Sequence, residues 1–134
     1  CDSGNNRILR LDTDLKVTGC YTGFTGSTEI SVGEDGRSTF LNPNGIYVKK
    51  SIFDDKLYVY IADTDNSRAV KCTESGTEMT LVQEYTKPDT KLYDSETFNP
   101  SKILADKAEN IYVVCKSVNT GSVQFNKDGE FQGF

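Results

Sequence analysis

The chain has 134 residues, with 15 basic and 20 acidic side chains and a net charge of −5. Its length suits one domain, and its acidic balance disfavours nucleic acid, which is bound by clustered lysine and arginine. No run approaches the roughly 18 apolar residues of a membrane-spanning helix, so no direct membrane insertion is expected. No signal peptide is expected either, because the chain opens on CDSGNNRILRLD, which is typical of a folded unit.

In chain order, short runs rich in Val, Ile, Tyr, Phe and Thr alternate with clusters of Gly, Asn, Asp and Ser. Such runs predict strands, and no segment keeps the apolar spacing of an amphipathic helix. The sequence therefore predicts an all-β protein. Its strands are expected at 7–13, 17–24, 45–53, 56–62, 68–74, 78–86, 101–107, 110–116, 122–128 and 130–134.

Two of the predicted turns share one phrase, DSGNNR at 2–7 and DTDNSR at 63–68. Gly and Asn at these turns favour positive φ. Each aspartate is expected to accept hydrogen bonds from backbone amides two or three residues on, and to pair with the arginine across the hairpin. A structural role is favoured over a metal or substrate site, because the phrase is repeated. The residues concerned are Asp2, Asn5, Arg7, Asp63, Asn66 and Arg68.

Two longer polar connections, 25–44 and 87–101, also repeat a pattern. Each contains an aromatic residue followed closely by Asn-Pro, and Pro43 and Pro100 lie 57 positions apart. Proline suits the start of a strand because it donates no ladder hydrogen bond. Four strands in a repeat of about 40–60 residues are the signature of a β-propeller blade.

The residues that carry this period resemble a known family. YIADTDNSRAVKCTESG, at 60–76, is similar to an NHL repeat, and CDSGNNRILRLD, at 1–12, is similar to the same repeat entered partway. A third copy, 98–131, keeps the Pro, the Tyr and the closing DGEF, but KSVNTG replaces the Asp-x-x-Asn-x-Arg phrase. The resemblance covers nearly the whole chain.

The resemblance implies four-stranded antiparallel blades, about two and a half of them, from a ring of six. Residues 1–24 would end a first blade, 43–86 would form the second and 100–134 the third, joined by 25–42 and 87–99. An open arc leaves apolar end faces in water. The chain is therefore expected to be part of a longer protein, to self-associate, or to require the missing blades. The particular sequence of these repeats also resembles bacterial NHL-type propellers, and this resemblance implies an extracytoplasmic or cell-surface location.

The chain contains no histidine, and this disfavours catalysis. The usual general base, the Ser/His and Cys/His nucleophile pairs and most catalytic zinc sites need that residue. We therefore expect no catalytic, cofactor-binding or metal-binding residue. Acidic residues Asp54, Asp55 and Glu109 lie in loops near one predicted propeller mouth, where lactonases bind calcium, but solvated turn acids are the favoured interpretation.

The remaining candidates are cysteines and tyrosines. Cys1, Cys20, Cys72 and Cys115 form no CxxC motif. They could form two disulfides in three connectivities, or be small buried hydrophobic residues, which the apolar runs around the last two favour. A stripe of aromatic residues is expected to pack between blades rather than to bind a ligand. It comprises Tyr47, Tyr58, Tyr60 and Tyr112.

Two functions follow from the sequence. The favoured one is a non-catalytic binding or scaffold module that presents a propeller face to a protein, peptide or glycan. The alternative is part of a calcium-dependent, lactonase-like six-bladed hydrolase, whose ligands would lie in other blades. A peptidyl-hydroxyglycine-lyase-like propeller would need histidine ligands for zinc, which this chain lacks.

Overall fold

The computed structural model describes residues 1–26, 38–116, 118 and 121–134. The all-β prediction is confirmed, and each expected strand is present. The strands are β1 Ile8–Leu11, β2 Val17–Tyr21, β3 Pro43–Lys50, β4 Leu57–Asp63, β5 Arg68–Glu74, β6 Met79–Tyr85, β7 Pro100–Ala105, β8 Ile111–Cys115, β9 Ser122–Phe125 and β10 Phe131–Gly133. Two single-turn 3₁₀ helices, η1 Ser3–Asn5 and η3 Thr64–Asn66, precede β1 and β5.

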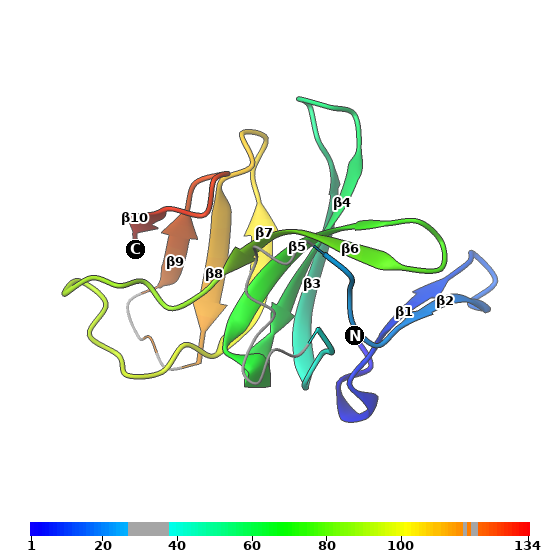
Figure 1. Cartoon of the computed structure of the whole chain (residues 1–134), viewed down its shortest axis with the longest axis horizontal. Coiled ribbons are helices and arrows are strands. Elements are labelled where there is room, and N and C mark those ends of the chain that lie inside the picture. The colour runs from blue at the N-terminus through cyan, green and yellow to red at the C-terminus, as the bar shows by residue number, and fades with distance from the viewer. Residues whose placement is uncertain (27–37, 117, 119–120) are drawn as a thin grey trace.

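The strands form three antiparallel sheets, none of them closed (Figure 1). Strands β1 and β2 make a two-stranded hairpin, β3 to β6 make a four-stranded meander, and β7 to β10 make another. Each strand pairs with its neighbour in sequence, as short turns between alternating runs dictate. The β5–β6 turn closes with the Ser75 amide donating to the Glu78 carbonyl, with Gly76 at φ 100°.

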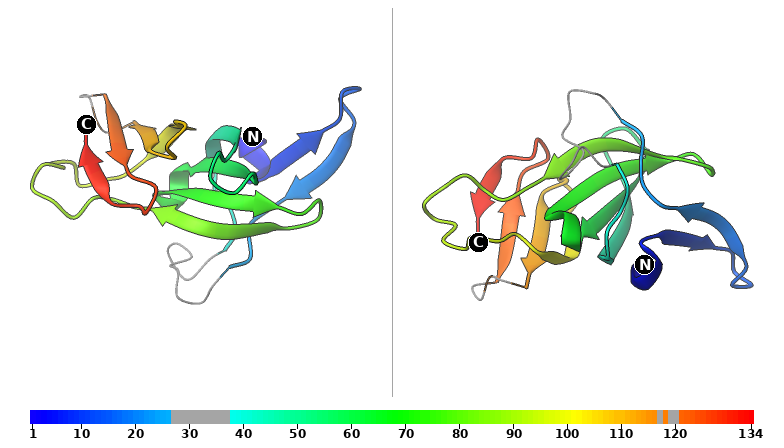
Figure 2. Two further views of the ribbon diagram at one scale, coloured as in Figure 1. Left: turned by 90° about the horizontal axis from the view of Figure 1, so that it is seen from above. Right: turned by 60° about the horizontal axis from the view of Figure 1, so that its bottom comes forward.

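The β3–β6 sheet lies between the other two (Figure 2). Its strand β4 is buried on both faces, because successive side chains point to opposite sides of a strand. Tyr58, Tyr60 and Ala62 face the β7–β10 sheet, whereas Val59 and Ile61 face the hairpin. This double burial explains why the segment has no polar alternation.

Two apolar cores therefore hold the three sheets together. Each buried large side chain contributes about 1.5–3 kcal/mol relative to exposure. The core beside the hairpin contains Ile8, Tyr21, Phe24, Phe40, Val59, Ile61, Val70, Cys72, Met79 and Leu81. The core beside the β7–β10 sheet contains Tyr58, Tyr60, Ala62, Ala69, Tyr85, Tyr93, Phe98, Ile103, Ala105, Ile111, Val113, Cys115, Val123 and Phe125.

The first strands of the two larger sheets, β3 and β7, approach each other closely at Gly45. A Cβ atom on this residue would lie 2.6 Å from the Ser101 carbonyl oxygen and 2.9 Å from the Lys102 Cα. Both contacts are with backbone, which cannot move aside cheaply. Gly45 is thus fixed by the packing of one sheet on the next.

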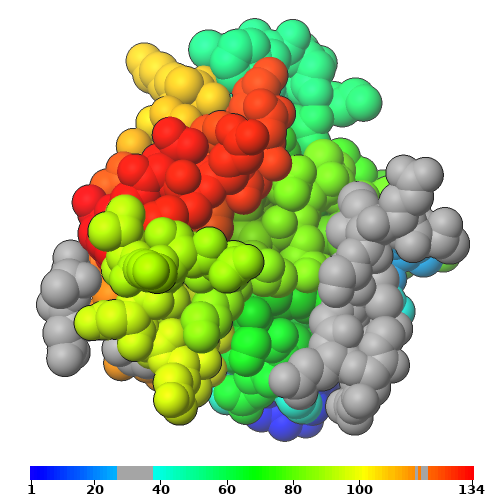
Figure 3. All heavy atoms as spheres, turned by 60° about the vertical axis from the view of Figure 1, so that its left-hand side comes forward, coloured from blue at the N-terminus to red at the C-terminus, as the bar shows by residue number. Residues whose placement is uncertain are grey.

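The connection between β6 and β7 packs beside the C-terminal strand. Figure 3 shows this connection, in yellow-green, lying against the C-terminal residues in red. The Tyr93 ring stacks on the Phe134 ring at 6.3 Å, and Phe98 meets Phe125 edge-on at the same distance. The connection therefore closes one side of the second core.

Candidate functional site

The second copy of the repeated phrase forms a buried ionic turn. Helix η3 places Asp63 and Arg68 opposite each other, where β4 ends and β5 begins. The Arg68 Nε donates to Asp63 Oδ2 at 2.8 Å, and the Asn66 side-chain amide donates to the same oxygen at 2.9 Å. Both charged side chains are fully buried. A desolvated pair of this kind holds its geometry only because further hydrogen bonds complete it.

The preceding connection supplies those bonds. The Leu41 amide donates to Asp63 Oδ1 at 2.8 Å, and the Thr39 carbonyl accepts from Asn66 at 2.8 Å and from Arg68 at 3.3 Å. The Phe24 ring, which follows β2, lies 4.7 Å from the guanidinium carbon, a cation–π distance. The ion pair thus joins the β3–β6 sheet to the chain segment that leads out of the hairpin.

The first copy has the same local geometry without the cover. The Arg7 Nε donates to Asp2 Oδ2 at 2.6 Å, and the Asn5 amide donates to both carboxylate oxygens at 3.1 Å. These hydrogen bonds from Arg7 and Asn5 lower the pKa of Asp2. The side chains of Asp2 and Arg7 remain 28% and 38% exposed. One sequence phrase therefore builds one turn in two different surroundings.

The expected capping by aspartate is wrong in both turns, and the expected positive φ at Gly or Asn holds only for the first turn. Neither aspartate side chain caps its turn amides, because each carboxylate is occupied by the arginine and the asparagine. The left-handed residue is Asn6 in the first turn and Ser67 in the second, each at φ 54°, whereas Gly4 lies within η1. The 3₁₀ turn moves the positive φ to its last position.

A hydroxyl group from each turn also reaches the next sheet. The Ser3 Oγ donates to the Pro43 carbonyl at 2.5 Å, and the Thr64 Oγ1 donates to the Pro100 carbonyl at 2.6 Å. Ser3 and Thr64 hold the same position in the repeated phrase. The acceptors, Pro43 and Pro100, are the first residues of β3 and β7. The repeat is thus also a repeated contact between sheets.

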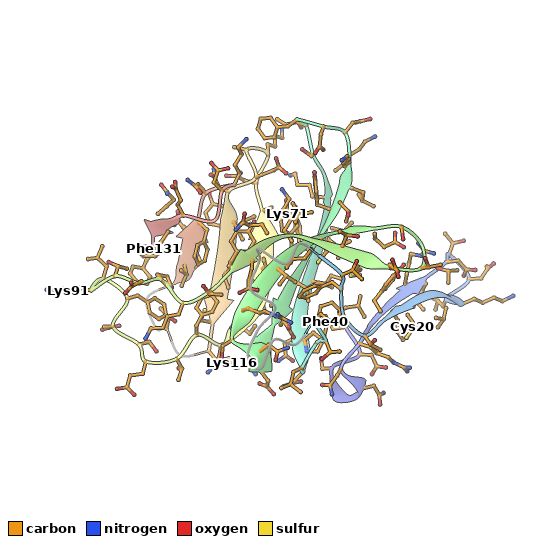
Figure 4. The ribbon with its side chains drawn as sticks, in the orientation of Figure 1. Cys20, Phe40, Lys71, Lys91, Lys116 and Phe131 are labelled. Atoms are coloured by element: carbon orange, nitrogen blue, oxygen red, sulfur yellow. The ribbon has the colours of Figure 1, made fainter. Side chains whose placement is uncertain are left out.

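A second buried ion pair lies between the two larger sheets. The Lys71 Nζ, on β5, donates to the Glu109 carboxylate at 2.8 Å and sits 4.1 Å from the Tyr58 ring centre. Each side of the pair is only 7% exposed. Figure 4 shows Lys71 at the centre of the molecule, where the β3–β6 sheet meets β7. The Asp54 and Asp55 side chains are exposed, as expected.

The expectation that Glu109 is a solvated turn acid is wrong. Glu109 takes a left-handed conformation, φ 62°, in the turn between β7 and β8. This turn ends at the face of the β3–β6 sheet, so its carboxylate is buried over Lys71. The sequence feature that could have indicated this pair is Lys71, because a lysine whose side chain is buried between two sheets needs an acidic partner.

The rings of Tyr58 and Tyr60 lie beside this ion pair. Tyr58 donates to Asp54, and this bond together with burial raises the pKa of Tyr58 to about 12. Burial raises the pKa of Tyr60 and of Tyr85. Tyr58 and Tyr60 are buried between the sheets, whereas Tyr47 and Tyr112 are half-buried. Among the described residues the Tyr85 hydroxyl finds no hydrogen-bond partner.

Replacing Tyr85 with phenylalanine should therefore stabilise the protein. The change removes a buried hydroxyl that makes no bond, and we expect a gain of about 1 kcal/mol in the free energy of unfolding. The matched change Tyr58→Phe removes a bonded hydroxyl and should lower stability by a similar amount. Urea denaturation followed by circular dichroism measures both; a loss of stability in Tyr85→Phe would show that the hydroxyl is bonded in solution.

All four cysteines are free thiols. Cys72 and Cys115 are buried within the two cores, as expected, whereas Cys1 and Cys20 are exposed, contrary to that interpretation. Burial raises the pKa of Cys72 to about 12 and that of Cys115 to about 11. Cys20 lies on the hairpin, as labelled in Figure 4.

This difference predicts the order of thiol modification. Cys1 and Cys20 should react with a chromogenic disulfide reagent in the folded protein, and Cys72 and Cys115 only after denaturation. Counting the released chromophore before and after adding guanidinium measures this, and Cys20→Ser should remove one fast-reacting thiol. Rapid reaction of a buried thiol would show that a core opens readily.

An open hollow lies beside β3, the first strand of one larger sheet, and β7 and β8 of the other. Its volume is about 510 Å³. Tyr47 on β3 and Tyr112 on β8 line it, and Leu104 and Val114 expose 48% and 43% of their surface there. The remaining lining residues are Lys102, Ile103 and Ser122. Apolar and aromatic groups with a few polar neighbours are typical of surfaces that bind another molecule.

The comparisons add no family assignment. No family model matches the chain, and no curated protein is significantly similar to it. Within the described ranges, no three Asp, Glu or Cys side chains gather so that they could hold a metal ion. No helix in the same part of the chain is long and apolar enough to cross a membrane.

Proposed function

We propose that the chain is part of an NHL-type β-propeller, possessing about two and a half blades of a six-bladed ring, that acts as a non-catalytic binding or scaffold module. The repeated turn supports this proposal, because Ser3 and Thr64 join successive sheets by the same hydroxyl-to-proline bond. Its partner is a protein, peptide or glycan, and its setting is extracytoplasmic or at the cell surface as part of a larger protein.

The observation that carries the non-catalytic role is the use of the buried charges. Among the described residues, Asp63, Arg68, Lys71 and Glu109 are buried and form two ion pairs, Asp63–Arg68 and Lys71–Glu109. The Glu84 carboxylate, whose side chain is 7% exposed, lies 3.9 Å from the Arg68 guanidinium and joins the first pair.

The Lys71–Glu109 pair joins the two larger sheets, whereas the Asp63–Arg68 pair bonds to the Leu41 amide and the Thr39 carbonyl of the segment that leads out of the hairpin. Carboxylates and amines engaged in this way are not positioned to exchange protons with a bound substrate. The buried ion pairs therefore hold the sheets together.

The binding surface that we propose is the open hollow of Tyr47 and Tyr112. Tyrosine supplies apolar area together with a hydroxyl, which suits peptides and glycans alike. Lys102 and Ser122 at the same hollow add hydrogen-bond donors. A ligand would lie across β7 and β8, with its apolar groups against Leu104 and Val114.

Peptide and glycan arrays probed with the labelled chain test this function. Ligands retained by the natural chain should be lost with Leu104→Asp, whereas Ile52→Asp, at another exposed apolar residue, should bind normally. Retention of every ligand by Leu104→Asp would move the binding surface elsewhere. Failure of both variants to bind would show that the loss is not specific to this hollow.

Calcium distinguishes the binding module from the lactonase-like alternative. In a protein that contains this chain together with the remaining blades, a site that bound calcium with Kd near 10 μM would stabilise the fold by about 2.7 kcal/mol at about 1 mM calcium. The binding-module proposal expects an unchanged melting temperature and no hydrolysis of lactones. A calcium-dependent rise together with lactone hydrolysis would contradict it.

A further inference from the structure

One asparagine of the chain is followed directly by glycine. Asn44 precedes Gly45 in β3, whereas each of the other asparagines precedes a larger residue. An asparagine side chain can close a ring with the next backbone nitrogen, and glycine, which has no side chain, hinders this closure least. Asn42 and Asn99 precede prolines, whose nitrogen carries no hydrogen, so this reaction is closed to them. The Asn44–Gly45 pair is therefore the place in the chain where an asparagine loses its side-chain amide most readily.

The fold gives the Asn44 side chain a role between two sheets. A bulge interrupts the pairing of β3 with β4 between Pro43 and Gly45, which makes Asn44 the extra residue. The Asn44 side-chain amide donates to the Thr64 Oγ1 at 3.0 Å, and this hydroxyl donates to the Pro100 carbonyl at 2.6 Å. Asn44 is thus the first member of a chain of hydrogen bonds that crosses from the β3–β6 sheet to β7.

The backbone of Gly45 is held from two sides. On one side it pairs with Ala62 of β4, and on the other a Cβ atom at this position would lie 2.6 Å from the Ser101 carbonyl oxygen. Ring closure requires the Gly45 nitrogen to approach the Asn44 Cγ to about 3–3.5 Å, with the reacting orbitals aligned. The peptide between the two residues has to turn for this, and the neighbouring strands oppose the turn. Both residues are half-buried, so water reaches them, and the protection comes from geometry.

We propose that Asn44 is a modification site that is protected while β3 and β7 are packed together and that reacts when they separate. The Gly45 nitrogen then bonds to the Asn44 Cγ, the bond from Cγ to Nδ2 breaks, and ammonia leaves with the proton of the Gly45 amide. Water opens the resulting cyclic imide at either carbonyl carbon. Breaking the new bond gives aspartate, and breaking the original backbone bond gives isoaspartate, in which the main chain runs through the side-chain carbon.

Both products should weaken the junction between the sheets. An aspartate at position 44 has no donor for the Thr64 Oγ1, whose own proton is already donated to the Pro100 carbonyl. Isoaspartate lengthens the backbone by one carbon directly before Gly45, where the neighbouring strand leaves no room for a Cβ atom. The reaction therefore marks, irreversibly, a chain whose sheets have separated. This inference does not depend on the binding function proposed above.

The internal repeat supplies a variant without this chemistry. PSKI, at 100–103, aligns with PNGI, at 43–46, so Ser101 stands where Asn44 stands in the preceding unit. Serine has no carboxamide and cannot form the ring, but its hydroxyl keeps a hydrogen-bond donor at this position. Asn44→Ser is therefore the matched variant that removes the reaction.

Ageing the chain in its folded and unfolded states tests the protection. The natural chain, with its thiols kept reduced, is held at mildly alkaline pH in buffer and in urea above its unfolding midpoint, and peptide mass spectrometry follows conversion at Asn44. Conversion should be at least about tenfold slower in buffer than in urea, because the rate follows the open fraction of the chain. Equal rates in the two conditions would overturn the proposal. So would conversion in urea that is no faster at Asn44 than at Asn126, which precedes lysine.

Refolding after ageing tests the irreversibility. The urea is diluted after increasing times, and circular dichroism measures the fraction of chains that refold. The yield of the natural chain should fall as Asn44 converts, whereas the yield of Asn44→Ser should stay constant over the same period. Mass analysis of the refolded fraction gives an answer without any variant, because converted chains should be depleted from it. A parallel decline of both chains, or converted chains that refold as well as unconverted ones, would contradict the proposal.

Discussion

The Asp63→Asn variant should be about 3–5 kcal/mol less stable than the natural protein. The change removes the carboxylate that bonds directly to the buried Arg68 guanidinium and, among the described residues, leaves the Glu84 carboxylate, 3.9 Å away, as a counter-charge; breaking one partner out of a buried ion pair is costly. It also replaces one carboxylate oxygen with an NH2 group, which cannot accept a hydrogen bond, so either the bonds from Arg68 and Asn66 or the bond from the Leu41 amide is lost. Because a domain of this size is stable by about 5–15 kcal/mol, the variant should lie close to unfolding.

The chain contains the control for this experiment. Asp2→Asn makes the same chemical change in the same turn, but the side chain is partly exposed and water replaces the lost interaction. We expect a much smaller shift of the urea midpoint for Asp2→Asn than for Asp63→Asn. Similar midpoints for the two variants would contradict the assignment of Asp63 to a buried pair.

Replacing Glu109 with glutamine should destabilise the protein by about 3 kcal/mol. The isosteric change keeps the shape of the side chain and leaves Lys71 charged beneath the β7–β8 turn. The Tyr58 ring, 4.1 Å from the Lys71 ammonium, offsets part of the loss through its cation–π contact. Thermal and urea denaturation of the single variant measures the effect.

A double variant shows whether the charge, rather than the side chain, matters. Lys71→Met alone leaves Glu109 unpaired and should be destabilising, whereas Lys71→Met with Glu109→Gln leaves no buried charge and should recover much of the stability. The pair is therefore expected to show a strong coupling in a double-mutant cycle. Additive losses in the double variant would contradict a direct ion pair.

The strands could be predicted from local patterns alone. Alternating runs such as KLYVYIA and short turns such as ESGT fix both strand identity and the neighbour with which each strand pairs, because consecutive antiparallel strands pair through such turns. The ends were less predictable. The run 122–128 was expected to continue, but β9 stops at Phe125 because the Asn126 amide already bonds to the Glu130 carbonyl and closes the turn.

The repeated turns show what local sequence can and cannot reveal. DSGNNR and DTDNSR predict the same pairing of aspartate with arginine, and both pairs are present. Their difference in burial comes from Phe24, Thr39 and Leu41, which lie far away in sequence. No feature of the phrase itself distinguishes an ion pair that stabilises the interior from one that faces water.

Glu109 shows the same limit from the opposite direction. Its neighbours Asp106 and Asn110 mark a polar turn, and polar turns normally lie in water. Only the stacking of one sheet on another brings this turn over Lys71. To predict this ion pair, one would need to know how the two sheets pack on each other. The alternation of side chains along a strand shows which residues share a face, but not which sheet packs against that face.

The cover of Arg68 also has a consequence for how the protein opens. The contacts that cover the Asp63–Arg68 ion pair are the Phe24 ring, the Thr39 carbonyl and the Leu41 amide. If the segment that carries them detached, the Arg68 charge would stay buried in the neighbouring sheet without these contacts. Partial unravelling from the hairpin side should therefore be disfavoured, and neighbouring sheets should lose their structure together. In native-state hydrogen exchange, the amides of Leu41 and of β5 should share one opening free energy.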